Sequence, residues 1–572
     1  MEMDTEKRWL ITLILTFGVL LLWRAYFAPP TPPPAHPKTA TPAKPEAGAR
    51  PAVQAKAAAP PPRVALPLEQ GSEARDIVVE NDNYRVTLST QGAVVKSWIL
   101  KKFQDAQNKP LNVVNTTAFA QLGYPLSLEL ADAALASKLN TALYVVEPSG
   151  EDLHAPQDVT FTYSDGKVQV KKELSFGSGY QVKVKVSVFD GEHDLPLSVK
   201  WPGGVGDQSL PLAERNKYSR AFYDHGDGIT TVAEKKATES QSIPGPLTFA
   251  GLEDLYFAGV FLPDSPQDVF RFSSQSWMPE GWKGKEPPRA LEAVLGTPQS
   301  RPLSFRLFIA PKVLDVLRAE NPALEDLVNF GWFSFIAKPI FLGMRWFYDH
   351  AIHNWGWAIV ILTVLINMAF FPLKLKSIRS AQAMQKISPQ MKEIQNRYKQ
   401  YKFNDPRRQR MNQEIMELYK KHGVNPLGGC LPMVVQLPII YGFYEVLESS
   451  IAMRHAPWIW WIKDLSVPDH LYILPSLAIV LSFIMQKMTP MPTADPAQQR
   501  MMMIAPLAVG FIFFELAAGV TLYYFVYSAV AILQQVIVNR IAPPQNPAQA
   551  TPAAGKAQNA SPGTRKPATV KS

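Results

Sequence analysis

The residues of greatest chemical interest lie in an uncharged segment, residues 425–444, which contains Pro432, Gln436 and Pro438. A proline removes a backbone hydrogen-bond donor, and a glutamine is costly in hydrocarbon unless its amide faces protein or water. The segment is long and apolar enough to enter a bilayer, and it directly follows a strongly basic stretch. We therefore expect a membrane helix that borders a polar recess, where hydrogen bonding is the available chemistry.

Covalent chemistry has no comparable signature in the chain. The motifs GxGxxG, GxxxxGK[ST], HExxH and GxSxG are absent from the long polar region before the apolar segments. Cys430 is the single cysteine, which rules out an intramolecular disulfide framework. We predict that the protein is not an enzyme and that it has neither a catalytic residue, a cofactor nor a metal site.

Composition indicates a chain with both membrane and soluble parts. Of its 572 residues, 47% are hydrophobic, yet the net charge is +9 and long polar stretches separate the apolar runs. A basic balance suits nucleic acid or anionic lipid. Because the basic residues concentrate beside the apolar segments, we favour a role at the membrane surface and in setting topology.

The N-terminal half predicts an anchor, a tether and a β domain. Residues 1–28 hold a first apolar span without an evident cleavage site, so we expect an uncleaved anchor. Residues 29–72 form a Pro/Ala-rich flexible linker, with 13 prolines between Ala28 and Ser72. Residues 73–320 alternate with period two and predict a large all-β sandwich, for which a structural or docking role outranks an enzymatic one.

The C-terminal half predicts a polytopic α-helical membrane protein with six transmembrane helices in all. Residues 501–539 would reach about 58 Å as one helix, so the chain must fold back, most simply near residues 517–519. The predicted parts are an interfacial amphipathic helix at 329–350, a five-helix core at 355–540 that includes a helical hairpin at 377–423, and a basic tail at 541–572. The core spans are expected at 355–372, 427–448, 471–486, and twice within 501–539.

The basic hairpin has internal helix signals. Residues 373–427 hold 13 Lys or Arg against four acidic residues. Asp405 suits an N-cap, Pro406 the first helical position, and Gly423 the end of the second helix. One apolar stripe of the first helix consists of Met384, Ile387, Met391, Ile394 and Tyr398. The stripe either packs only within the hairpin or belongs to a surface that also contacts RNA, lipid or protein.

The distribution of basic residues predicts the orientation of the spans. The positive-inside rule places the hairpin and the tail in the cytoplasm. With six spans, both termini are then cytoplasmic and the β domain lies on the outer side.

Six segments of the C-terminal half resemble, in order, the YidC/Oxa family of membrane protein insertases. They are WGWAIVILTVLINMAFFPL, NPLGGCLPMVVQLPIIYGFY, APWIWWIKDLS, YILPSLAIVLSFIMQKMTP, DPAQQRMM and GVTLYYFVYS. The anchor, the large β domain and the five-helix core resemble the Gram-negative branch of the family. The resemblance implies an inner-membrane protein with a periplasmic β domain and a hydrophilic groove, closed on the outer side, that receives the polar flank of an incoming protein.

The groove residues expected from this resemblance include one departure. The family's bacterial pattern usually has an arginine five residues before the proline that ends the second span, where this chain has Asn367. Asn367, with Thr363 and Gln436, can still hydrate a groove, or Asn367 and Gln436 can simply bond each other. The missing charge is compensated if Lys374 or Lys376 reaches inward. Tyr523 and Tyr524 match positions that line the substrate path, or they are core packing.

The resemblance also implies partners. Clients would be nascent membrane proteins, and the β domain would face the Sec translocon and its accessory subunits. The hairpin and tail would meet the ribosome or a targeting receptor, with basic contacts expected from Lys374, Lys376, Arg379, Arg407 and Arg408. Two other functions stay open: an assembly scaffold that acts only with the Sec translocon, and a small-solute transporter.

Overall fold

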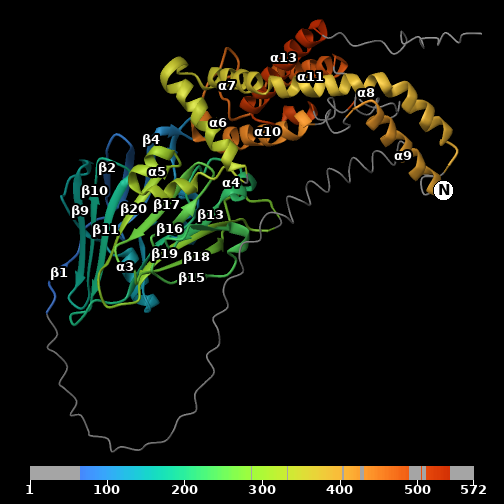
Figure 1. Ribbon diagram of the computed structural model, residues 1–572. Coiled ribbons are helices and arrows are strands. Elements are labelled where there is room, and N and C mark those ends of the chain that lie inside the picture. The colour runs from blue at the N-terminus through green and yellow to red at the C-terminus, as the bar shows by residue number, and fades with distance from the viewer. Residues whose placement is uncertain are drawn as a thin grey trace, which may run out of the picture.

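The computed structural model describes residues 65–284, 286–331, 333–401, 405–424, 431–488, 504 and 510–541. The predicted N-terminal anchor, most of the linker, Cys430, most of the fifth span and the tail beyond residue 541 lie outside these residues. The described chain forms a β domain and a helical region, and the helices α6 and α10 lie where the two meet (Figure 1).

Twenty strands build the described part of the β domain. They are β1 Leu68–Glu69, β2 Asp76–Glu80, β3 Tyr84–Ser89, β4 Val94–Gln104, β5 Pro110–Asn112, β6 Ser127–Glu129, β7 Val145–Glu147, β8 Asp152–His154, β9 Gln157–Asp165, β10 Gln169–Phe176, β11 Gln181–Phe189, β12 Leu197–Trp201, β13 Arg220–Asp224, β14 Ile229–Ala233, β15 Gln241–Ile243, β16 Phe249–Glu253, β17 Phe257–Pro263, β18 Val269–Ser276, β19 Arg289–Thr297 and β20 Leu303–Pro311. Short helices interrupt and follow them: α2 Phe119–Leu122, α3 Ala133–Thr141, α4 Leu212–Tyr218 and α5 Leu314–Glu320.

The strands form three sheets around one core. The largest sheet has the order β1-β9-β10-β11-β20-β17-β16-β13-β14, with β7 beside β9. Two five-stranded sheets have the orders β15-β18-β19-β12-β6 and β5-β4-β3-β2-β8. Val79, Val184 and Leu295, one from each sheet, are fully buried in the same hydrophobic cluster. The predicted β-sandwich is confirmed.

The period-two pattern explains this core. Every second residue of β11 and of β20 is buried, and the buried residues face each other in register, with Val184 opposite Phe305 and Val182 opposite Leu307. Because alternate side chains of a strand point to opposite faces, these runs place one apolar face on the core. Asp165 and Gly166 form the predicted turn between β9 and β10, where Gly166 adopts a φ of +83°.

The helical region contains α6 Ser334–Phe347, α7 Trp355–Ala369, α8 Phe371–Arg397, α9 Pro406–Lys421, α10 Leu431–Ser449, α11 Ile473–Met488 and α13 Ala518–Ile541. Short turns of other helix types complete it: η4 Tyr348–Ile352, η6 Ile451–Met453 and η7 Phe511–Phe514. Helix α13 packs against α7, α10 and α11, and α10 also packs against α6. A turn at residues 515–517 directly precedes α13, so the break comes slightly before the predicted 517–519, and the fold-back between two spans stays a prediction.

The helix found at the second predicted span, α7, is shorter than the uncharged run at residues 355–372 that predicted it. Helix α7 ends at Ala369, Phe370 caps both helices, and α8 begins at Phe371. Pro372 lies in the first turn of α8, a position where its missing N–H costs little. The break therefore comes before the proline, and α7 covers about 22 Å instead of the predicted 27 Å.

Few described helices are long and apolar enough to cross a bilayer. Ala518–Ile541 meets that test by itself, whereas Ser334–Ile352 and Trp355–Ala369 meet it only as a pair that bends by 118°. Ile473–Met488 is apolar but shorter. The structure does not confirm six transmembrane helices, and that number stays a prediction.

Helices α8 and α9 form an antiparallel pair that projects away from the β domain (Figure 1). The Asp405 carboxylate accepts a hydrogen bond from the backbone N of Arg407 at 2.9 Å, and Gly423 has a φ of +62°, so the predicted ends of α9 are confirmed. The apolar stripe of α8 is buried from Met384 to Ile394, and Tyr419 of α9 donates to Met391 Sδ at 3.1 Å. The stripe thus packs within the pair.

Candidate functional site: a polar row inside the helical region

A group of polar side chains lies between α7, the first turn of α8 and α13. Asn367, on the last turn of α7, is 4% exposed. Its amide nitrogen donates to the backbone oxygen of Thr363 at 2.8 Å, and Thr363 is fully buried one turn earlier. Gln534 of α13, which is also buried, donates to the backbone oxygen of Asn367 at 3.1 Å. Protein groups thus provide hydrogen bonds to these buried amides, where an unpaired polar group would be costly.

Lys374 brings a positive charge to this group. It lies one turn into α8, and its ammonium donates to Asn367 Oδ1 at 2.9 Å and to Gln534 Oε1 at 3.2 Å. The ammonium also lies 4.7 Å from the centre of the Tyr527 ring of α13. Its recorded partners are thus two neutral amides and an aromatic face. Within the described residues, Lys374 has no carboxylate within ion-pair distance.

A second polar contact lies on the same side of α13. Gln436 Nε2 of α10 donates to the hydroxyl of Tyr523 at 2.7 Å. The Tyr523 ring stacks on Phe443 with centroids 4.2 Å apart, and it lies 6.4 Å from the Tyr527 ring. Tyr523, Tyr527 and Gln534 follow one another along α13 at helical spacing.

We call Gln436, Tyr523, Tyr527, Lys374, Asn367 and Gln534 the interior polar row. The row extends from α10 through the tyrosines of α13 to the junction of α7 and α8. Helical spacing on α13, and the seven-residue spacing of Asn367 and Lys374 across the junction of α7 and α8, bring these side chains together. Asn367 and Gln436 belong to the same row, but they bond different partners and not each other.

The other predicted groove residue, Tyr524, lies beside the row. Its ring is 6.2 Å from the Tyr527 ring and 4.4 Å from the ring of Phe513. It is partly exposed, whereas Tyr523 is 2% exposed. The two adjacent tyrosines therefore have different surroundings.

The predicted basic residues separate into two groups. Lys374 joins the row, whereas Lys376 and Arg379 are exposed on α8. Arg407 lies 3.8 Å from Asp405 and over the Tyr401 ring, and Arg408 donates to the Tyr401 backbone oxygen at 3.2 Å. Those two side chains therefore pack around the start of α9, and the structure does not bring them near the row.

Sequence reasoning missed Gln534 and Tyr527. The signal for Gln534 was available, because Gln534 and Gln535 are adjacent amides in an otherwise apolar run. Each is at most 8% exposed. A helix whose polar residues are buried and whose apolar residues Leu533 and Ile537 are exposed has its polar side toward protein. This reversed burial of polar and apolar residues in α13 becomes evident only when the packing of the helices is known.

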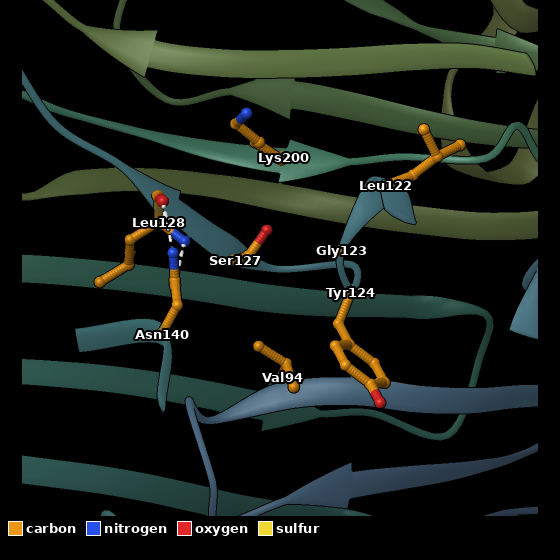
Figure 2. A pocket seen from close by; sticks show the side chains of 8 residues that line it. All are labelled: Val94, Leu122, Gly123, Tyr124, Ser127, Leu128, Asn140 and Lys200. Carbon is orange, nitrogen blue, oxygen red and sulfur yellow. Dashed lines mark hydrogen bonds between the residues drawn. The ribbon is translucent and has the colours of Figure 1, made fainter. Parts of the chain in front are cut away.

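A cavity in the β domain is a second candidate (Figure 2). It measures about 220 Å³ and is lined by Val94, Leu122, Gly123, Tyr124, Ser127, Leu128, Asn140 and Lys200. Asn140 exchanges two hydrogen bonds of 2.8 Å with the Leu128 backbone, and Lys200 lies 3.1 Å from Glu129. These polar groups already serve the fold, so we assign the cavity no ligand. Across the part of the chain that the structure describes, no group of three His, Cys, Asp or Glu residues could hold a metal ion.

The family models and the curated relatives point to one family. Residues 76–342 match the model of the YidC periplasmic domain, and residues 346–545 match that of the 60Kd inner membrane protein. A membrane protein insertase YidC of Geobacter metallireducens is 33% identical, with 94% of this chain and 98% of the relative covered. One of Syntrophus aciditrophicus is 29% identical over 94% of this chain and 99% of its own. A crystal structure of an active YidC insertase covers 82% of this chain and 94% of its own, at 17% identity and a TM-score of 0.35.

Proposed function

Because the chain belongs to the YidC family of membrane protein insertases, we propose that it inserts proteins into the inner membrane along the interior polar row, and that it helps them fold there. The client's polar flank would enter between α7, α10 and α13. No nucleotide hydrolysis is required, since burial of the client's apolar segment supplies the free energy.

The observation that carries this proposal is the interior polar row. A charged residue at the centre of a bilayer costs about 2.5 to 3.5 kcal/mol on insertion scales. Amide and hydroxyl groups along a membrane helix offer a polar flank hydrogen-bond partners during its passage, which lowers that cost. Thr363, Asn367, Gln436, Tyr523 and Tyr524 are accordingly proposed as groove residues.

Lys374 is proposed to supply the positive charge that the family's usual arginine supplies at position 367. Its ammonium lies 2.9 Å from Asn367 Oδ1, so the positive charge lies beside the position of the family's usual arginine. An ammonium held by neutral amides can pair with an acidic side chain of the client.

The proposed orientation follows from charge. Six spans would place the β domain in the periplasm, and the α8–α9 hairpin and both termini in the cytoplasm. Exposed Lys376 and Arg379, together with Arg407 and Arg408, would then lie in the cytoplasm and contact the ribosome or a targeting receptor. The β domain would face the Sec translocon and its accessory subunits. These partners rest on the family resemblance.

Insertion into liposomes that contain only this protein tests the proposal. The client is a short single-span protein with a polar outward tail, and the readout is protease protection relative to empty liposomes. We expect clear protection. Folded protein that gives no protection above empty liposomes would instead favour a scaffold that acts only with the Sec translocon.

A further inference from the structure

The loop between α10 and α11, residues 450–472, connects the β domain to the helices, and we call it the junction loop. Ile451 is 6% exposed and belongs to the hydrophobic core of the β domain. Arg454 forms an ion pair with Asp207, and their side chains are 8% and 0% exposed. The loop is thus anchored in the β domain by one apolar and one charged side chain.

The Asp207 end of this ion pair is rigidly held. The Asp207 carboxylate also accepts hydrogen bonds from the backbone N of Ala106 at 3.2 Å and of Ser209 at 2.8 Å. Its own backbone N donates to the Asp254 carboxylate at 3.1 Å. Gly206 has a φ of +114°, and a Cβ there would lie 1.8 Å from Asp254 Oδ2. Position 206 therefore requires glycine, and the hydrogen bonds fix where the Asp207 carboxylate lies.

The same loop binds the first turns of α11 and α13. The backbone oxygens of Leu465 and Val467 accept hydrogen bonds from Gly519 at 2.9 Å and from Ala518 at 2.8 Å. Asp469 accepts from the backbone N of Leu474 at 2.8 Å. Each of these bonds uses a backbone donor that a helix start leaves free.

The start of α7 contacts the loop as well. Asn354 caps α7 and also donates to the backbone oxygens of Pro457 and Trp458, at 3.2 and 3.3 Å. Gly356 lies so close to Trp458 that a Cβ there would be 2.2 Å from Trp458 Cδ1. The starts of α7, α11 and α13 are therefore joined through one loop.

The end of α10 has its own contacts with the β domain. The Glu448 carboxylate accepts a hydrogen bond from the Tyr218 hydroxyl and lies 3.4 Å from Lys217 Nζ. The Tyr256 hydroxyl donates to the Glu448 backbone oxygen at 3.3 Å. Thus α10, and through the loop α7, α11 and α13, are all held from the same side.

We propose that the β domain seals the interior polar row against its own compartment, with Asp207 and Arg454 as the positioning residues that hold the junction loop. The inference rests on the proposed function, because it assumes that the row serves as a path. If the ion pair is lost, a buried charge is left without its partner, and the loop detaches from the β domain. The ends of α7, α11 and α13 then separate more often, and water enters the row from the β-domain side.

Labelling of a buried cysteine tests this seal without any client. In a Cys430→Ala background, Val520→Cys places a thiol on α13 at a position that is 5% exposed. A membrane-impermeant thiol reagent is added to proteoliposomes in which protease reaches the β domain. With Arg454→Met we expect labelling to accelerate by about tenfold or more, because labelling follows the population of the opened state.

Two further variants keep the test decisive. Asp76→Asn removes the exposed ion pair between Asp76 and Lys96, which measures 2.8 Å, and should leave labelling unchanged. Ile451→Ala weakens the apolar anchor while it preserves the ion pair, and should also accelerate labelling. Unchanged labelling in folded Arg454→Met and Ile451→Ala proteins overturns the seal, as does equal acceleration by Asp76→Asn. Insertion activity does not enter this readout, so failure of the seal and failure of the proposed function are distinguishable.

Discussion

Lys172 in the β domain and Lys374 in the helical region are both interior lysines, but their partners differ. Lys172 is 1% exposed and donates to the backbone oxygens of Gly92, Ala93 and Leu126 at 2.8 to 3.0 Å. Lys374 is partly buried and donates to the side-chain amides of Asn367 and Gln534.

The difference indicates which charge is structural. All three donors of the Lys172 ammonium bond to backbone that belongs to separate segments of the sandwich, so the charge holds those segments together. Two donors of Lys374 bond to side-chain amides, and its ammonium also lies over the Tyr527 ring. An ammonium with exchangeable partners can take a carboxylate from outside, whereas one surrounded by backbone oxygens cannot.

Substitution of Lys172 is expected to have the largest effect on stability. Lys172→Met leaves three buried carbonyl oxygens without a donor, which should lower the free energy of unfolding by about 3 to 5 kcal/mol. Denaturant unfolding followed by intrinsic fluorescence measures this loss. Lys183→Met, an exposed lysine on neighbouring β11, is the matched control and should change it by less than about 0.5 kcal/mol. Equal effects would show that Lys172 does not hold the sandwich together.

Asp254 accepts a hydrogen bond from the backbone of Asp207, which holds the junction loop, and it should make the stability of the protein depend on pH. Burial raises the pKa of the Asp254 carboxyl from 3.8 to about 6, against the opposing effect of three backbone N–H donors and of Lys312. Between pH 4 and pH 6 the folded protein keeps a proton that the unfolded chain releases, so stability falls as the pH rises through this window. The full change is about 3 kcal/mol.

The variant Asp254→Asn isolates this contribution. It cannot titrate, so its melting temperature should depend less on pH between 4 and 6 than that of the wild type. The measurement is a thermal unfolding series over this pH range for both proteins. Parallel curves would show that Asp254 does not titrate in this window.

Substitution of Lys374 should affect insertion more than folding. Lys374→Met is expected to reduce insertion of a client with an acidic polar flank by about tenfold, and that of a client with a neutral flank much less, since the lost contact is an ion pair. Lys386→Met, an exposed lysine on the same helix, is the matched control. The double variant Lys374→Met/Asn367→Arg should regain insertion of the acidic client. Equal losses for both clients would contradict an electrostatic role.

The sequence predicted more of the β domain than of the contacts within the helical region. Alternation in β11 and β20 predicted the buried face of the sandwich, because a strand's period of two follows directly from backbone geometry. Asp405 and Gly423 likewise predicted the ends of α9 from local hydrogen bonding. Position 367 was identified as lacking the usual charge, and Lys374 was one of two lysines that could compensate for it.

The other features of the candidate site depend on contacts between segments that are distant in sequence. Lys374 lies seven positions after Asn367 and so shares its helix face, whereas Lys376 lies on the opposite face. Only the packing of α13 against the face of Asn367 shows that this face is interior. The partnership of Gln534 with Asn367 spans 167 positions and depends on how α13 packs against α7. The junction loop gave no signal of its anchoring role, since Arg454 and Asp207 are 247 positions apart.

The smallest expected effect concerns the neutral end of the interior polar row. Gln436→Leu and Tyr523→Phe each remove one partner of the 2.7 Å hydrogen bond between α10 and α13. A neutral hydrogen bond contributes about 0.5 to 1.5 kcal/mol, so each change should lower insertion about threefold for acidic and neutral clients alike. Because both substitutions remove the same bond, the double variant should lose no more than the worse single variant. Losses that multiply in the double variant would show that Gln436 and Tyr523 act on the client independently of the bond between them, so that the neutral end of the row also contacts the client.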